Sequence, residues 1–288
     1  MEPITRNFTF LTAAFPHGAY QSQGFNQPEL RPPSVKGQLR WWYDALFDNK
    51  DTEDKLFGGL KNRRDGDQPG PESSRVIVRI RCLTPHQSLP VDFIPHKGNG
   101  VRKNCVPPGT QYEIHLIPRR EGASEAEQTR LERVLDAWLL LGAVGQRGNR
   151  AAGSLWPENA PQTPDEFLKR SVELLGNSRI KAAILDRDFG NDERQLRHVA
   201  GNFLAGEAFH SCNTPFGEVD SRNRIRKPSL LKLRAARLDG GLRLVALWDG
   251  RWPKQPVSNL RRGIEIMAQE TDKPIGKLLL AAMHALTG

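Results

Sequence analysis

Hydrophobic and polar residues alternate along three stretches in the first half of the chain, and this period of two predicts strands. The stretches are residues 4–12, 75–83 and 110–118. In the middle stretch Val76, Val78 and Ile80 fall on one face while three arginines fall on the other, which is the clearest strand signal in the chain. Each predicted strand is therefore expected to bury one face.

Two helices are predicted in the same half. Apolar residues recur at helical spacing over residues 35–46, with Ser34 as the expected N-cap and an end near Phe47. A longer amphipathic helix is predicted over residues 125–141, and the short run SLWP at 154–157 follows it as a last strand. Residues 61–74 and 85–108 are predicted to be irregular. The resulting order, βαββαβ, is that of a ferredoxin-like domain.

The second half has a less regular pattern. Pro164 and Gly176 bracket a predicted helix that Thr163 begins, and residues 192–205 predict another. Two alternating runs within residues 229–250 meet at Asp239-Gly240-Gly241, which predicts a hairpin. Two short helices are expected at 257–269 and 275–286. No internal repeat of residues is visible.

Composition fits a globular protein of one large or two small domains. The chain has 288 residues, of which 38% are hydrophobic. It contains no apolar run long enough to span a membrane and no apolar segment of the signal-peptide type, so a cytoplasmic protein without membrane contact is expected. Three widely spaced cysteines, Cys82, Cys105 and Cys212, are expected to be reduced thiols.

The positive charge is concentrated in one segment. The whole chain carries a formal net charge of +9, and residues 222–262 alone contain twelve Lys or Arg against two Asp. Such a segment favours a surface that faces a polyanion. A solvated face that only aids solubility is the alternative.

Two stretches combine cations with features suited to phosphate. Arg31, Lys36 and Arg40 lie around the start of the first predicted helix, where free N–H groups favour anions. An ordinary amphipathic helix with its cations in water explains the same residues. Trp41 or Trp42 could stack on a base, although a core position is the commoner role for a tryptophan beside Leu39.

The second stretch is the glycine-rich loop at residues 142–153. It contains Gly145, Arg147, Gly148, Asn149 and Arg150, whose amides and guanidinium groups could hold a sugar-phosphate backbone. It is neither a Walker A loop, because no Gly-Lys-Ser/Thr follows, nor a dinucleotide fingerprint, because it follows a helix instead of opening one.

Together these stretches resemble the RAMP superfamily of CRISPR-associated proteins, and within it the subunit at the crRNA 3′ end of the type III-B (Cmr) effector complex. The family phrase R-P-x-S-[IV]-[KR]-G-x-L-R-[FW]-W is similar to residues 31–42, and its L-F-G to residues 56–58. The family's glycine-rich loop resembles residues 142–155, except that Ala151 and Ala152 stand where a basic residue and a glycine are commoner. Residues 224–235 match the family only loosely.

The resemblance implies an α+β fold of two ferredoxin-like (RRM-like) βαββαβ domains packed together, the second irregular, which we place at residues 1–157 and 158–288. It also implies a non-catalytic subunit that holds the 3′ region of the guide RNA and its target duplex by backbone contacts in antiviral defence. The expected partners are crRNA, target RNA and other RAMP subunits, with no cofactor. The predicted RNA-binding residues are Arg31, Ser34, Lys36, Arg40, Trp41, Gly145, Arg147, Asn149, Arg150, Arg224, Arg226 and Lys227.

Two other functions stay open. Some RAMP proteins are endoribonucleases that process guide RNA, for which His17, with Tyr20 nearby, is the best candidate acid or base; a solvated loop histidine is the simpler explanation. A scaffold that contacts only neighbouring subunits is the second.

Two further assignments concern single side chains. Asp44, one helical turn after Arg40, is expected to be its ion-pair partner. Cys82, His86, His96 and Cys105 could form a zinc site only in principle, because their spacing lacks a C-x-x-C pair, and none is predicted.

Overall fold

The computed structural model describes most of the first 203 residues and a smaller part of the remainder. The described residues are 2–16, 27–59, 73–85, 87–98, 100–119, 124–203, 218–220, 225–227, 229, 231–249 and 265. The helices predicted at 257–269 and 275–286 lie almost wholly outside them. No helix within these ranges is long and apolar enough to cross a membrane.

The first sheet has four antiparallel strands in the order β2-β5-β1-β6. Its strands are β1 (Ile4–Phe10), β2 (Val76–Cys82), β5 (Gln111–Pro118) and β6 (Leu155–Pro157). Strands β1, β2 and β5 were predicted from the alternation of apolar residues, and their predicted buried faces are confirmed; β6 lies in the short run SLWP that was predicted as the last strand. Val76, Val78, Tyr112, Ile114 and Leu116 are buried.

Three helices accompany this sheet: α1 (Pro32–Phe47), α2 (Lys50–Phe57) and α3 (Glu125–Leu141). Helices α1 and α3 pack against each other on the apolar face of the sheet, where the ring of Trp138 lies 6.0 Å from that of Phe8. Helix α3 has the predicted bounds, because Ser124 and Glu127 form a capping box. Helix α2 was not predicted.

The start of α1 corrects the prediction that Ser34 is its N-cap. Arg31 occupies the N-cap position without a side-chain bond, and the helix begins with Pro32 and Pro33. Proline is tolerated there because the first helical N–H groups have no intrahelical partner. Ser34 is already inside the helix, and its N–H donates to the carbonyl of Arg31 at 3.0 Å.

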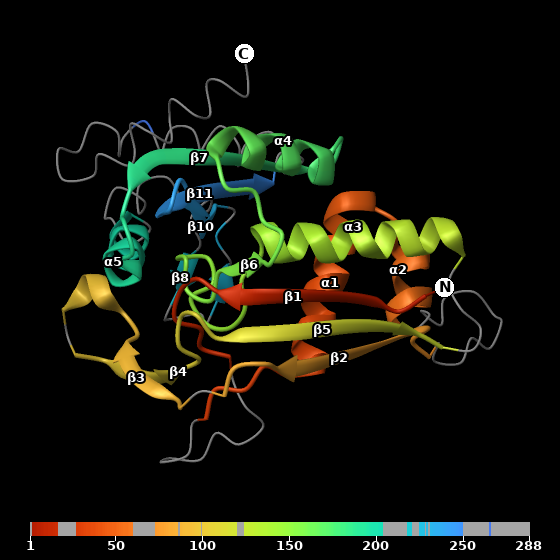
Figure 1. The fold of residues 1–288 in the computed structure, drawn as a ribbon, viewed down its shortest axis with the longest axis horizontal. Coiled ribbons are helices and arrows are strands. Elements are labelled where there is room, and N and C mark those ends of the chain that lie inside the picture. The colour runs from red at the N-terminus through yellow and green to blue at the C-terminus, as the bar shows by residue number, and fades with distance from the viewer. Residues whose placement is uncertain are drawn as a thin grey trace.

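Residues 85–108, predicted to be irregular, contain a two-stranded hairpin. Strands β3 (Leu89–Asp92) and β4 (Arg102–Cys105) are joined through a short 3-10 helix, η1 (Pro95–Lys97). The hairpin packs against α5 (Glu193–Phe203), which the sequence predicted, and Figure 1 shows the two side by side at one end of the molecule. Arg197 of α5 donates to the carbonyl of Asp92 at 2.8 Å.

The second sheet has the strand order β10-β11-β7, again antiparallel. The predicted hairpin is present as β10 (Lys232–Leu238) and β11 (Gly241–Asp249), and its turn places Asp239 and Gly240 at positive φ, as a type I′ turn requires. Strand β7 (Ile180–Asp188) was not predicted. Helix α4 (Pro164–Leu175) has the predicted capping residues, and a separate small ladder joins β8 (Glu218–Asp220) to β9 (Ile225–Lys227).

One continuous core extends across both sheets. It includes Phe10 and Trp138 from the first half and Phe167, Leu233 and Leu244 from the second, all almost fully buried. In Figure 1, α3 runs between the two sheets. The fold is therefore α+β with antiparallel sheets, and the glycine-rich loop lies where the sheets meet.

Candidate functional site

The glycine-rich loop connects α3 to β6 and folds back on itself. The N–H of Val144 donates to the carbonyl of Gly153 at 2.9 Å. Gly145 has a φ of 90°, and a Cβ there would lie 2.5 Å from the backbone of Phe15. Gly153, at a φ of 63°, would place a Cβ 2.0 Å from the carbonyl oxygen of Val144. Both positions therefore require glycine.

The loop is held on two sides by main-chain hydrogen bonds. On the side of the first sheet, the N–H of Gln146 donates to the carbonyl of Phe15 at 2.9 Å. On the other side, Leu233 of β10 donates to the carbonyl of Asn149 and accepts from the N–H of Ala151, both at 3.0 Å. The second sheet thus supports the loop that the sequence placed in the first domain.

Arg147 and Arg150 are the cations of this loop, and both are partly buried. Arg147 has a positive φ, and its guanidinium lies 5.7 Å from the ring centroid of Phe93. Its Nη2 is buried and has no hydrogen-bond partner. Burial, followed by the nearby charges of Arg150 and Arg197, lowers the pKa of Arg147 to about 10. Burial also lowers the pKa of Arg150.

The β3–β4 hairpin adds residues that the sequence analysis missed. The ammonium of Lys103 lies 4.2 Å from the ring centroid of Phe93 and 3.0 Å from Oε1 of Gln146. The rings of Phe93 and Phe15 meet edge to face at 5.1 Å. No signal pointed to these residues, because the whole segment was predicted to be irregular.

His96 of the hairpin is also close to the loop arginines. Burial, then the charges of Arg147 and Arg150, lowers the pKa of His96 to about 4. Both of its ring nitrogens are buried without a hydrogen-bond partner. The imidazole is therefore neutral at pH 7, and the positive potential here comes from the lysine and arginines.

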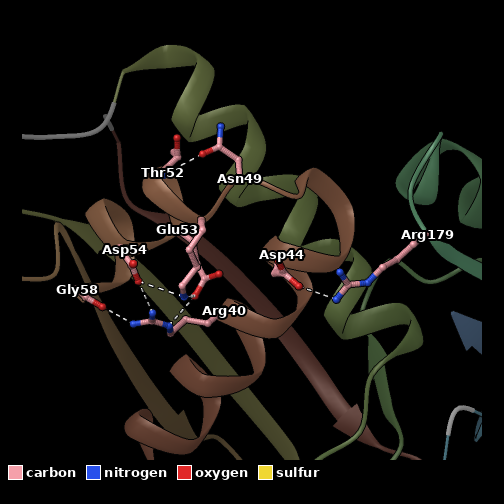
Figure 2. A network of polar contacts seen from close by, with 9 residues as sticks. Arg40, Asp44, Asn49, Thr52, Glu53, Asp54, Gly58 and Arg179 are labelled. Atoms are coloured by element: carbon pink, nitrogen blue, oxygen red, sulfur yellow. Dashed lines mark hydrogen bonds and ion pairs between the residues drawn. The ribbon is translucent and has the colours of Figure 1, made fainter. Parts of the chain in front are cut away.

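Arg40 is engaged within the protein instead of facing outward. Figure 2 shows its guanidinium directed at α2, where Nε donates to Glu53 at 2.8 Å and Nη2 to Asp54 at 2.6 Å. Its Nη1 donates to the carbonyl of Gly58. Glu53 is almost fully buried, so this network gives Arg40 a structural role, and the geometry does not favour it as a phosphate ligand.

The predicted pairing of Asp44 with Arg40 is wrong. Asp44 instead accepts from Nη2 of Arg179 at 2.6 Å, as Figure 2 shows. Arg40 has two carboxylates available from α2, which the sequence analysis did not recognise as a helix.

The other candidates in α1 make no described polar or ring contact with the glycine-rich loop. Ser34 is exposed, and Arg31 and Lys36 are partly buried. Burial, then the charges of Arg40 and Arg119, lowers the pKa of Lys36. Within the described ranges, no hydrogen bond, ion pair or ring contact joins these three residues to residues 145–150. In the described part of the chain, no interaction of these kinds therefore links the two predicted stretches directly.

Strand β10 connects the two stretches indirectly. The ammonium of Lys232 lies 5.0 Å from the ring centroid of Trp41 in α1, while the next residue, Leu233, bonds to the glycine-rich loop. Trp41 is partly buried and also meets Trp42 edge to face at 5.2 Å. Trp42 is a core residue.

The basic segment at 222–262 is described only in part. Arg224 lies outside the described residues, and for Arg226 and Lys227 only the backbone, in β9, is described. Arg234 is buried, and Arg243 pairs with Asp186 at 3.4 Å and Asp239 at 3.5 Å. The described cations of this segment thus do not form one exposed face.

Some of the residues considered for catalysis or zinc lie outside the described part of the chain. His17, Tyr20 and His86 lie outside the described residues. In the described ranges, Cys82 and Cys105 are not joined in a disulfide, and no three His, Cys, Asp or Glu side chains cluster as a metal site would require.

Comparison with known proteins identifies the family. A model of the RAMP superfamily matches residues 7–156, which is more than half of the chain. The CRISPR system Cmr subunit Cmr1-1 of Pyrococcus furiosus is 28% identical over 202 residues, covering 62% of this chain and 52% of that protein. The chain therefore spans about half the length of this curated relative.

Solved structures show the same fold. The crystal structure of apo Cmr1 from Pyrococcus furiosus superimposes with a TM-score of 0.53 at 18% identity, covering 86% of this chain and 88% of that one. A chain of the type III-B Cmr-β complex bound to cognate target RNA and AMPPnP superimposes with a TM-score of 0.54 at 10% identity. This match covers 92% of this chain and 100% of that one. From its matched first half and its α+β fold, this chain belongs to the RAMP superfamily and resembles Cmr1, a subunit of the type III-B Cmr complex.

Proposed function

We propose that this chain is a non-catalytic, RNA-binding subunit of a type III-B CRISPR ribonucleoprotein that acts in antiviral defence. In this role it holds the 3′ region of the guide RNA, and its duplex with target RNA, by contacts to the sugar-phosphate backbone. Its partners are other RAMP subunits. The similarity to Cmr1, and to a chain of a Cmr-β complex bound to target RNA, supports this proposal.

The observation that carries the proposal is a group of cations without carboxylate partners at the glycine-rich loop. Lys103, Arg147 and Arg234 form no ion pair with any described residue, although Arg234 is buried and Arg147 partly so. Desolvating a cation is unfavourable unless an anion compensates it. Phosphates along an RNA strand supply such anions without any need to read base edges.

The proposal includes two domains, divided near residue 157. In the first half, the order β2-β5-β1-β6 with α1 and α3 is that of a ferredoxin-like unit. In the second half, β7 and α5 precede β10 and β11, with the small β8–β9 ladder between them. The sheet order β10-β11-β7 matches three strands of the same unit. A second ferredoxin-like domain, of which the described residues supply three strands and one helix, accounts for this order.

Binding of labelled single-stranded RNA to filters at several salt concentrations tests the function. The wild-type chain should retain RNA with an affinity that falls steeply with ionic strength. The double variant Lys103→Met/Arg147→Met should bind at least tenfold more weakly, and its slope of log K against log[salt] should fall by about 1.4 if two phosphate contacts are lost. Lys181→Met, which removes an exposed charge from β7, is the control.

The alternatives predict different results. A scaffold that contacts only proteins would retain no RNA at any salt concentration. An endoribonuclease would cut repeat RNA without metal, and His17→Ala would abolish the cutting. Either result would contradict the proposal.

A further inference from the structure

Two arginines of the described chain are more than nine-tenths buried, and they differ in whether a carboxylate lies beside them. Arg197 is 3% exposed, and its Nε donates to Glu193 at 2.6 Å, so a carboxylate compensates its charge. Arg234 is 7% exposed and has no carboxylate partner within the described ranges. The fold therefore retains one buried cation uncompensated, at the position where β10 meets the glycine-rich loop.

Within the described ranges, the hydrogen bonds of Arg234 all go to main-chain oxygens. Its Nη1 donates to the carbonyl of its neighbour Leu233 at 2.9 Å and to the carbonyl of Gly148 in the glycine-rich loop. Its Nε is buried without a hydrogen-bond partner. Burial lowers the pKa of the guanidinium to about 9, which still leaves it charged at neutral pH. A permanent positive charge thus lies directly beneath the loop.

The contact with Gly148 fixes the orientation of one peptide group. In a trans peptide the C=O and the following N–H point in opposite directions. Since the carbonyl of Gly148 points towards Arg234, the N–H of Asn149 points away from it. No described residue accepts a hydrogen bond from this N–H. The carbonyl of Asn149 is fixed in turn by the N–H of Leu233.

We propose that Arg234 is a positioning residue for RNA binding, which holds the Gly148-Asn149 peptide so that the Asn149 amide faces a backbone phosphate. Its uncompensated charge also raises the positive potential beneath the same loop. This inference rests on the proposed RNA-binding function. It adds a residue from the second sheet to a loop that belongs to the first half of the chain.

Replacing Arg234 by methionine separates this role from a purely structural one. Replacing buried charges by apolar side chains of similar length is often neutral or stabilising, provided that no partner charge is left unpaired. Arg234→Met leaves no carboxylate unpaired and removes only hydrogen bonds to two main-chain oxygens, so the variant should unfold within a few degrees of the wild-type temperature. Arg197→Met leaves Glu193 without its partner and should unfold at a lower temperature.

The experiment measures three quantities for the wild type, Arg234→Met, Arg234→Lys and the charge control Arg6→Met. They are single-stranded RNA affinity, thermal unfolding, and hydrogen exchange of the Arg150 and Ala151 amides, which bond to Arg147 and Leu233. Arg234→Met should weaken RNA binding about tenfold, the effect of one lost interaction of ordinary strength. It should also speed exchange of the two loop amides, leaving α3 unchanged. The RNA affinity of Arg234→Lys should lie between those of the wild type and Arg234→Met, and Arg6→Met should bind RNA within twofold of the wild type.

The outcomes are distinguishable. RNA affinity of Arg234→Met within twofold of the wild type, or unchanged exchange of the loop amides, would overturn the inference alone. A large drop in its unfolding temperature would also overturn it, because that result indicates a purely structural arginine. Failure of the wild type to bind RNA would overturn the proposed function, and this inference with it.

Discussion

At the scale of single residues, the shape of the glycine-rich loop depends on the glycines that combine a positive φ with close contact to another stretch of backbone. Gly145→Ala should destabilise the protein by about 1 to 3 kcal/mol, because its φ of 90° is strained for alanine and the Cβ would meet the backbone of Phe15. Urea unfolding measures this loss. Gly148→Ala is the matched control: beyond its chain neighbours, the nearest atom to its Cβ would be the carbonyl oxygen of Gly145, at 3.4 Å. Equal stability of the two variants would contradict this account of the loop.

The Arg40 network yields a second prediction at this scale. Arg40→Met should lower the free energy of unfolding by about 1 to 3 kcal/mol, because Glu53 would stay buried with only Lys50 as a cationic partner. Below the unfolding temperature, its RNA affinity should stay within threefold of the wild type. Lys55→Met, which removes an exposed charge from α2, the helix that carries Glu53, is the control. A stable Arg40→Met variant that binds RNA poorly would restore Arg40 as a phosphate ligand.

At the scale of elements, docking of the β3–β4 hairpin on α5 should depend on pH. His96 is held neutral by burial and by the positive charges of Arg147, Arg150 and Lys97, with a pKa of about 4 against an ordinary 6.5. The unfolded chain therefore binds the proton more readily, and stability should fall as the pH drops from 6.5 towards 4. Because the ring is only partly buried, we expect a loss of about 1 to 2 kcal/mol.

Urea unfolding of the wild type and of His96→Leu, each at pH 7 and pH 4.5, measures this effect. The quantity compared is the free energy of unfolding that each protein loses between the two pH values. The wild type should lose more stability than His96→Leu over this interval, since carboxylates that titrate in the same range affect both. An equal loss in the two proteins would show that His96 does not contribute.

The elements that could be predicted from the sequence are those with local signals. Helices α3 and α4 carry capping boxes, and the β10–β11 hairpin has Asp-Gly at its turn, so their bounds follow from neighbouring residues. Strand β7 and the β3–β4 hairpin lack such signals. Ala182 and Ala183 blur the alternation in β7, and the hairpin strands have only four residues each. These elements are specified by what they pack against, which a single sequence does not contain.

The same limit applies to the candidate site. The loop itself could be predicted, because glycines and arginines are adjacent in the chain. The contributions of Phe93, Lys103 and Arg234 could not, because they come from distant segments and depend on which sheets meet. Sequence alone also assigned Arg40 to the site, since its acidic partners lie on a helix that was not predicted.

At the scale of the whole molecule, the two halves should unfold together. The N–H and C=O of Leu233 bond to the glycine-rich loop, and its buried side chain belongs to the core that extends across both sheets. Leu233→Ala should therefore cost about 2 to 5 kcal/mol and should still give one unfolding transition. Hydrogen exchange should rise in parallel for the amides of α3 and of β11, whereas the exposed-site control Val172→Ala should change neither. If β11 lost protection while α3 kept it, the halves would be independent folding units, and the glycine-rich loop would not need the second sheet to keep its shape.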